Sequence, residues 1–190
     1  MKIGIVGRKG HGKDAAADTL VRVFKFERVA FADPIKEMLH VGLGISRDVL
    51  WGPDSVKNVD DPAWGVSVRR MMQTLGTEWG RTHVHPDLWI RLALDRHIPA
   101  RERAGQEHFV VSDVRYVNEA EKLRDAGFHI LKIVRPGYGD DTDLHTSETE
   151  VDAIQPNFLI RNEGTLDDLA TAVIRYAEHR HAMSLGASCS

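Results

Sequence analysis

The 190-residue sequence has little cysteine, no long apolar run and no excess of charge of one sign. Its single cysteine, Cys189, excludes an internal disulfide, so we expect a reducing, cytoplasmic setting. No run of about 18 apolar residues occurs, which excludes a membrane-spanning helix. The 25 Lys and Arg residues nearly balance the 28 Asp and Glu residues, giving a net charge of −3. This balance argues against a protein whose main task is to coat nucleic acid.

The residues that are present form the pattern of a globular α/β protein. Five short, nearly continuous apolar runs are typical of strands buried on both faces. These runs are Lys2–Val6, Arg28–Phe31, His108–Ser112, His129–Val134 and Phe158–Arg161. Helical patterns lie between or after them, over Asp14–Phe24, Pro34–Val41, Val117–Ala126 and Thr165–His179. The alternation predicts a five-stranded parallel sheet with helices on both faces.

Two stretches interrupt this alternation within what we interpret as one domain over residues 1–190. Residues 42–98 contain two helical patterns and predict a helical insertion between the second and third strands. Residues 137–156 are polar and acidic and predict a short lid. The small and polar residues 182–190 predict a disordered tail. Because ligands of parallel sheets bind where the strands end, the loops at those ends are the candidate site.

The first of these loops matches a phosphate-binding loop. It follows a strand, opens a helix and fits G-x-x-x-x-G-K-[ST] except at Asp14. Its glycines let backbone N–H groups converge on phosphate oxygens, and Lys13 reaches the β- and γ-phosphates. The expected nucleotide-binding residues are Gly7, Lys9, Gly10, His11, Gly12, Lys13 and Asp14. Asp14 replaces the hydroxyl that normally contacts Mg²⁺, so we expect it to hold the metal through water. The alternative is a glycine-rich turn without a ligand.

Charged residues follow other strands of the predicted sheet. Asp113 comes after the run Phe109–Ser112, as in a Walker B element whose carboxylate serves Mg²⁺. The alternative for Asp113 is a carboxylate that opens a helix. Arg115 and Arg135 are candidates to neutralise the charge of a transferring phosphoryl group. A surface ion pair is the alternative for Arg135.

The predicted insertion offers a second group of candidates. At about 100° per residue, Arg69, Gln73 and Gly76 share one flank of the pattern that begins at Val66. A guanidinium, a carboxamide and a small residue suit a phosphate and the edge of a base. The alternative is a solvated helix surface. Asp33 and Lys36, after the second strand, are further candidates, although Asp33 is also the expected N-cap of the next helix.

Taken in order, these pieces resemble the bacteriophage-type deoxynucleoside monophosphate kinases, members of the P-loop nucleoside monophosphate kinase group. The matching pieces are Gly7–Asp14, Phe31–Lys36, Arg69–Gln73, Gly76–Glu78 with Arg81, Ser112–Arg115 with Asn118 and Glu119, His145 with Ser147 and Glu148, and Asn162–Leu166. They span nearly the whole chain. Ala15 departs from the family, which commonly has Thr after the Asp.

The resemblance implies an adenylate-kinase-like fold that transfers the γ-phosphate of ATP to a deoxynucleoside 5′-monophosphate. It implies ATP and Mg²⁺ as cofactors, with Asp14 and Asp113 at the metal and Asn162 and Gly164 by the adenine. Lys13, Arg115 and Arg135 would be catalytic. The acceptor would be bound by Asp33, Lys36, Arg69, Gln73, Gly76, Thr77, Arg81, Trp89, Asp113, Arg115, His145 and Glu148. Trp89 would stack on the base, with core packing as the alternative.

Other interpretations stay open at this stage. A dephospho-coenzyme A kinase or a shikimate-type kinase would use a hydroxyl acceptor, with Asp33 as the base. A non-catalytic ATP-binding module would explain the missing hydroxyl at Asp14 and Ala15. The resemblance implies no stable nucleic-acid or membrane partner, and it implies a host cytoplasm for a phage-encoded chain. It is compatible with a homodimer, which no heptad or apolar stripe demands.

Overall fold

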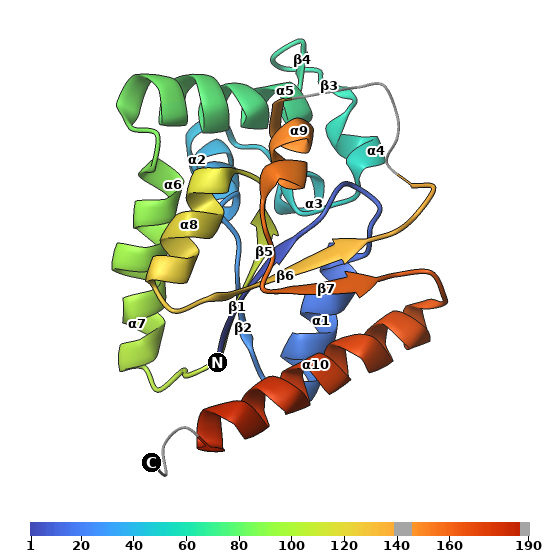
Figure 1. The fold of residues 1–190 in the computed structure, drawn as a ribbon. Coiled ribbons are helices and arrows are strands. Elements are labelled where there is room, and N and C mark those ends of the chain that lie inside the picture. The colour runs from blue at the N-terminus through green and yellow to red at the C-terminus, as the bar shows by residue number, and fades with distance from the viewer. Residues whose placement is uncertain (139–145, 187–190) are drawn as a thin grey trace. The chain divides into compact units, whose positions relative to one another are not determined.

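The computed structural model describes residues 1–138 and 146–186 (Figure 1). The chain divides into two compact units. The sheet unit comprises Met1–Ala30 and Leu94–Ser190, and the helical unit comprises Phe31–Ala93. Each unit has its own buried side chains. None of the helices in the described ranges is both long and apolar enough to cross a membrane.

The sheet unit contains five parallel strands in the order β2-β5-β1-β6-β7. They are β1 (Lys2–Val6), β2 (Glu27–Val29), β5 (Phe109–Val114), β6 (His129–Val134) and β7 (Phe158–Arg161). The predicted α/β fold with a five-stranded parallel sheet is confirmed, and β1, β6 and β7 have the predicted bounds. The second strand ends at Val29 rather than at the expected Phe31, because Phe31 already belongs to the helical unit.

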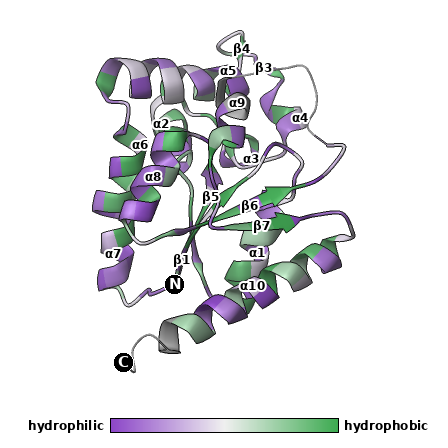
Figure 2. Ribbon diagram, in the orientation of Figure 1, coloured by the Kyte–Doolittle hydropathy of each residue, from purple (hydrophilic) through white to green (hydrophobic). Residues whose placement is uncertain are grey.

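Helices cover both faces of this sheet. They are α1 (Lys13–Phe24), α7 (Ile98–Arg103), α8 (Val117–Asp125), α9 (Thr146–Ala153) and α10 (Leu166–Gly186), and the π-helical segment η2 (Leu92–His97) precedes α7. Helices α1 and α10 lie on one face, while α8 and α9 lie on the other (Figure 1). Side chains such as Ile5, Leu20 and Val173 are fully buried between α1, α10 and the sheet. Strands β6 and β7 are mainly hydrophobic and α8 and α10 are mixed (Figure 2). Strand β6 is largely buried, whereas Phe158 and Leu159 of the edge strand β7 are exposed.

Local signals explain where two of these helices begin and end. Thr165 and Asp168 cap α10 reciprocally, with Thr165 N donating to Asp168 Oδ2 at 2.8 Å and Asp168 N donating to Thr165 Oγ1 at 3.2 Å. The bonds from Thr165 hold the pKa of Asp168 below its usual value. Helix α8 is followed by Gly127 at φ 80°, a conformation that favours glycine. Helix α10 continues to Gly186, well past the predicted end at His179 and into the segment expected to be disordered.

The helical unit packs short helices around a small apolar centre. Its elements are α2 (Asp33–Leu43), α3 (Arg47–Leu50), α4 (Asp54–Lys57), β3 (Asp60–Asp61), β4 (Val66–Ser67), α5 (Val68–Gln73), the π-helical segment η1 (Thr74–Val84) and α6 (Leu88–Arg91). The antiparallel pair β3–β4 was not predicted. The expected N-cap role of Asp33 is also wrong. Asp33 is the first residue of α2, and Ala32 precedes it with a helical backbone.

Candidate active site

The phosphate loop leaves the central strand β1 and is shaped by two crowded glycines. A Cβ atom on Gly7 would lie 2.5 Å from the carbonyl oxygen of Ile133 on β6. Gly12 has φ 99°, and a Cβ atom there would lie 2.8 Å from Leu169 and 2.9 Å from Asn162. Neither position accepts a side chain without displacing its neighbours. Gly10, in contrast, faces open space at the tip of the loop, where an anion can approach the backbone.

Two polar side chains hold this loop in place. The imidazole of His11 is 6% exposed, and its Nδ1 and Nε2 atoms lie 3.2 Å and 2.9 Å from the carbonyl oxygens of Ile133 and Tyr138. The amide of Asn162 is also buried and donates to the carbonyl oxygen of His11 at 3.1 Å. The sequence places both residues at the ATP site, and that placement stays a prediction. In the structure both side chains contact the protein backbone and so hold the loop in shape.

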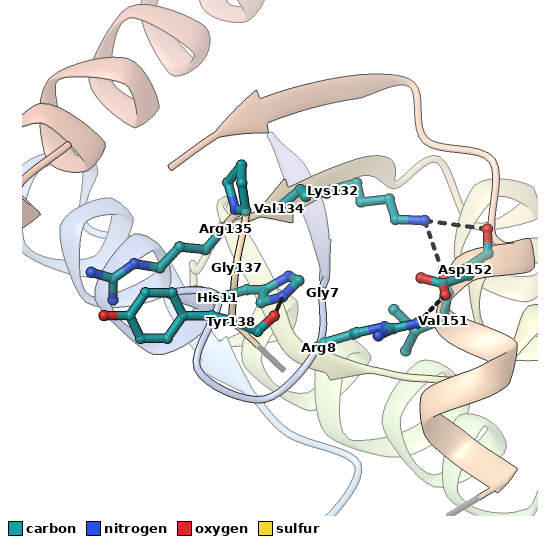
Figure 3. Close-up of a pocket in the computed structure, with 11 residues that line it drawn as sticks. Gly7, Arg8, His11, Lys132, Val134, Arg135, Gly137, Tyr138, Val151 and Asp152 are labelled. Carbon is teal, nitrogen blue, oxygen red and sulfur yellow. Dashed lines mark hydrogen bonds and ion pairs between the residues drawn. The ribbon is translucent and has the colours of Figure 1, made fainter. Parts of the chain in front are cut away.

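A cationic cavity of about 260 Å³ lies beside the loop (Figure 3). Arg8, Lys132 and Arg135 contribute positive charge to its lining, and Asp152 contributes a carboxylate. Arg8 pairs with Asp152 at 2.5 Å, and the Lys132 ammonium donates to the carbonyl oxygen of Val151 at 3.0 Å. Burial lowers the pKa of Lys132, and the nearby Asp152 opposes that effect. The excess of cations over carboxylates suits a phosphate-bearing ligand.

The cavity also contains the predicted catalytic residue Arg135. Its guanidinium carbon lies 3.9 Å from the centre of the Tyr138 ring, an arrangement visible in Figure 3. Such stacking orients the guanidinium while leaving its edge available for hydrogen bonds. The predicted catalytic Lys13 begins α1, and its ammonium donates to the carbonyl oxygen of Arg8 at 2.7 Å. Lys13 therefore lies folded across the phosphate loop.

Asp113 and Arg115 lie at the carboxyl end of β5, as predicted. Strand β5 carries one more residue than β1 between the pairs Gly4–Val111 and Val6–Val114. Such a bulge re-aims side chains next to a site. The turn that follows is held by Glu119, which is 1% exposed and accepts hydrogen bonds from Arg115 N at 2.7 Å and Tyr116 N at 3.1 Å. The sequence signal for this role was a Glu at the third position of a helix.

Arg28, which the sequence analysis did not identify as a candidate, lies beside α1. The guanidinium of Arg28, on β2, forms an ion pair with Asp14. It also donates to Asp18 Oδ1 and to Ser112 Oγ, each at 2.9 Å. No local pattern could have revealed these contacts, because they join α1, β2 and β5 across the fold.

The residues present fit Mg²⁺ in part. Asp113 offers a half-buried carboxylate at the end of β5. Asp14 fits less well, because its carboxylate already binds Arg28. Within residues 1–138 and 146–186, no three His, Cys, Asp or Glu side chains gather into a protein-only metal site. Magnesium at phosphoryl-transfer sites needs only one or two carboxylates, because phosphate oxygens and waters complete its coordination.

In the helical unit, the predicted acceptor residues lie on α2, α5, η1 and α6. Arg69 of α5 forms an ion pair with Asp54 of α4. Lys36 donates to Asp33 at 3.3 Å. The remaining polar candidates are partly exposed on α5 and η1; they are Gln73, Thr77 and Arg81.

Two residues predicted to contact the substrate are packed inside the helical unit. Trp89 is 1% exposed, and its indole N–H donates to the carbonyl oxygen of Gly76 at 2.7 Å. A Cβ atom on Gly80 would lie 2.5 Å from the Trp89 ring, and one on Gly76 would lie 2.9 Å from Ile35. These glycines allow close approach, but of Ile35 and Trp89 rather than of a substrate. Trp89 and Gly76 are core residues of this unit.

A second, exposed tryptophan lies in the same unit. Trp51 is 40% exposed and borders a shallow hollow of about 450 Å³ with Arg47, Asp48 and Gly52. The Lys36 ammonium lies 5.1 Å and the Arg47 guanidinium carbon 5.0 Å from its ring. An exposed indole with two cations suits a ligand that is both aromatic and anionic. The four-residue spacing of Arg47 and Trp51 was the only sequence signal for this group.

Three further candidates are His145, Glu148 and Gly164, and the structure describes them to different extents. His145 lies outside the described residues. Glu148 lies in α9, and its side chain is outside the described part. Gly164 follows β7, where a Cβ atom would lie 2.5 Å from the Asp168 carboxylate that caps α10. The absence of a side chain at Gly164 therefore allows Asp168 to cap α10. The predicted contact of Gly164 with ATP stays a prediction.

Comparison with known proteins identifies the family. Residues 53–173 match the family model of deoxynucleotide monophosphate kinases. A protein of Acanthamoeba polyphaga mimivirus, whose name as a deoxynucleotide monophosphate kinase is provisional, is 29% identical over 96% of this chain and 98% of its own length. The deoxynucleotide monophosphate kinase of Enterobacteria phage T4 is 31% identical over 63% of this chain, which spans about half (48%) of that protein.

The fold is similar to that of other small kinases. Shikimate kinase from Aquifex aeolicus superposes with a TM-score of 0.56 over 95% of this chain and 98% of that chain, at 11% identity. That likeness concerns the fold alone. The family model covers more than half of the sequence and includes the turn after β5, the cavity residues Arg135 and Asp152, and Arg69 of the helical unit. The chain belongs to the deoxynucleotide monophosphate kinase family.

Proposed function

We propose that this chain transfers the γ-phosphoryl group of ATP to a deoxynucleoside 5′-monophosphate, giving ADP and a deoxynucleoside diphosphate. The observation that carries the proposal is the phosphate loop with Lys13 and its cationic cavity, in a member of a deoxynucleotide kinase family. A phosphate loop alone would support any nucleotide-binding protein. Membership of the deoxynucleotide monophosphate kinase family narrows the acceptor to deoxynucleoside monophosphates.

The sheet unit would bind the donor. Backbone N–H groups from Gly10 to Lys13 would cradle the phosphates at the start of α1, where the helix dipole favours anions. Lys13, Arg115 and Arg135 would neutralise the charge on the transferring group. Magnesium, when bound, would neutralise the β- and γ-phosphate oxygens, with Asp113 as the protein carboxylate suited to hold it. Lys9 remains a candidate contact to the phosphates.

The helical unit would bind the acceptor. Arg69 and Arg81 would hold its phosphate, because a guanidinium presents paired donors to phosphate oxygens. Gln73 and Thr77 would meet polar groups of the nucleoside. Trp51 takes the stacking role that the sequence gave to Trp89, because its ring is exposed and flanked by cations.

A phosphate acceptor requires little acid–base chemistry from the protein. The acceptor phosphate is largely anionic at neutral pH and attacks without a strong base, so positioning and charge neutralisation supply the rate. Asp33, the candidate base for a hydroxyl acceptor, is held by the Lys36 ammonium. This pairing favours a role in ordering cations over a role as general base.

The test is a panel of acceptors offered with ATP and Mg²⁺. It contains the four deoxynucleoside monophosphates, the four ribonucleoside monophosphates, dephospho-coenzyme A and shikimate, and products are quantified by chromatography. We expect deoxynucleoside diphosphate and ADP in equal amounts. Phosphorylation of a hydroxyl acceptor instead would overturn the proposal, as would intact ATP with every acceptor.

Two variants connect this assay to the structure. Lys13→Met is expected to lower kcat by about 100-fold or more, because it removes a charge aimed at the transferring group. Lys122→Met is the matched control, since Lys122 is an exposed lysine of α8 away from the cavity. Asp33→Asn separates the acceptor classes. A loss of about 100-fold indicates a base for a hydroxyl, and a much smaller loss fits a phosphate acceptor.

A further inference from the structure

Arg28 is the hub of a hydrogen-bonded group beside the phosphate loop. Its Nη2 binds Asp14, its Nη1 binds Asp18, and its Nε binds the buried hydroxyl of Ser112. All of the atoms belong to the sheet unit. One guanidinium therefore links α1, β2 and β5, and it binds the residue that follows Lys13 in the chain.

The secondary structure fixes this geometry. Asp14 and Asp18 are four residues apart on α1 and so lie on one face of the helix. Arg28 is opposite Val110 in the β2–β5 register, two residues before Ser112. Two carboxylates and a hydroxyl thus converge on one side chain, and the planar guanidinium has donors in three directions to meet them.

This contact bears on the unusual position in the phosphate loop. Asp14 follows Lys13 where the common motif has a hydroxyl. An uncompensated carboxylate there would repel a nucleotide that carries several negative charges of its own. Arg28 supplies the opposite charge at the carboxylate itself. The pair is partly exposed, with Arg28 34% and Asp14 82% exposed, so its effect is expected on ligand binding more than on stability.

We propose that Arg28 is a positioning residue of the donor-phosphate site, which draws the Asp14 carboxylate aside and offsets its charge so that ATP can bind. Asp14 is then a partner of Arg28 and not a direct magnesium ligand. The inference rests on the proposed function only in taking ATP as the ligand of the loop. It does not depend on which acceptor is phosphorylated.

The experiment measures ATP binding at equilibrium by calorimetry, without an acceptor, once with EDTA and once across a Mg²⁺ titration. The variants are Arg28→Met, Asp14→Asn and the double variant. We expect Arg28→Met to weaken ATP binding about tenfold, and Asp14→Asn to bind ATP as tightly as the original chain or more tightly in EDTA. The double variant is expected to bind within about threefold of Asp14→Asn, because the charge that Arg28 offsets is gone.

A matched control separates the effect of the Arg28–Asp14 charge pair from the effect of removing any charged side chain of α1. Arg22→Met removes an exposed arginine from the last turn of α1 and is expected to leave ATP binding unchanged. Circular dichroism and thermal unfolding report whether each variant is folded. If Arg28→Met does not fold, Asp14→Asn in EDTA still decides the proposal.

Three outcomes would overturn the inference. Equal losses in Arg28→Met and the double variant would mean that Arg28 acts independently of Asp14. Weaker ATP binding by Asp14→Asn in EDTA would mean that the carboxylate assists the nucleotide. A higher Mg²⁺ requirement for Asp14→Asn would make Asp14 a metal ligand. A chain that binds ATP with the expected coupling but phosphorylates no deoxynucleotide would refute the proposed function and leave this inference standing.

Discussion

Replacing Trp89 with Phe tests the assignment of Trp89 to the core of the helical unit. The indole is 1% exposed, and its N–H donates to the Gly76 carbonyl oxygen at 2.7 Å. Phe cannot donate, so a buried carbonyl loses its partner, at a cost of about 1–3 kcal/mol. The smaller ring also leaves a cavity against Gly80, which adds about 1 kcal/mol. The expected loss in the free energy of unfolding is about 2–4 kcal/mol.

The assay is urea unfolding followed by circular dichroism, with Trp79→Phe as the matched control. Trp79 lies 6.3 Å from Trp89 between ring centres but is 41% exposed, so its replacement is expected to cost less than about 0.5 kcal/mol. Steady-state kinetics at a temperature where both variants are folded should give similar KM values for the acceptor. Equal stability of the two variants would refute the core assignment. A large rise in KM for Trp89→Phe without a loss of stability would restore the stacking role.

Three further outcomes follow from the same structure. His11→Ala removes an imidazole whose two nitrogens contact the carbonyl oxygens of Ile133 and Tyr138, so calorimetry should show ATP binding weakened by about five- to 100-fold, and unchanged binding would contradict the role of His11. Asp54→Asn should lower KM for the acceptor by up to about fivefold, because it releases Arg69, and a raised KM in steady-state kinetics would count against that assignment. Burial, with a smaller effect from Arg180, lowers the pKa of His129 in the folded chain. Below about pH 6.5 the unfolded chain therefore binds more protons than the folded chain, and the free energy of unfolding decreases as the pH is lowered. His129→Gln should therefore lose less stability than the original chain between about pH 7 and pH 5 in urea unfolding, and an identical loss would exclude His129 as a cause.

The sheet was predictable because its information is local. A parallel strand covered on both faces is a continuous apolar run, so β1 and β6 could be bounded to the residue. The edge strand β7 also has the predicted bounds, although most of its residues are exposed. Phosphate loops likewise carry their chemistry in contiguous glycines and a lysine, which the sequence displays between β1 and α1. The reciprocal cap of Thr165 and Asp168 is also local, because the two residues lie three positions apart in the chain.

The acceptor side was less predictable because its geometry departs from the regular helix. The flank assigned to Gln73 and Gly76 assumed 3.6 residues per turn, whereas the chain becomes π-helical at Thr74 and turns more widely. Positions that align on a regular helix then drift apart, and Gly76 and Gly80 turn toward Ile35 and Trp89.

Tertiary contacts account for the remaining differences. Arg28 meets Asp14 only because β2 packs beside α1, and Asn162 meets His11 only because β7 ends beside the phosphate loop. The phosphate-loop motif identified Asp14, and the family resemblance implied Asn162, as residues of the site. Neither could tell which of their partners would be protein and which would be ligand, because such partners lie far away in the chain.

The central claim is that the chain moves a phosphoryl group from ATP to a deoxynucleoside monophosphate. The most direct measurement follows the label from [γ-³²P]ATP in the presence of Mg²⁺ and a deoxynucleoside monophosphate. We predict that the label enters deoxynucleoside diphosphate in proportion to the ADP formed, and that Lys13→Met abolishes the transfer while Lys122→Met does not. Label that appears only as inorganic phosphate, or that stays in ATP with all four deoxynucleotides, would contradict the account.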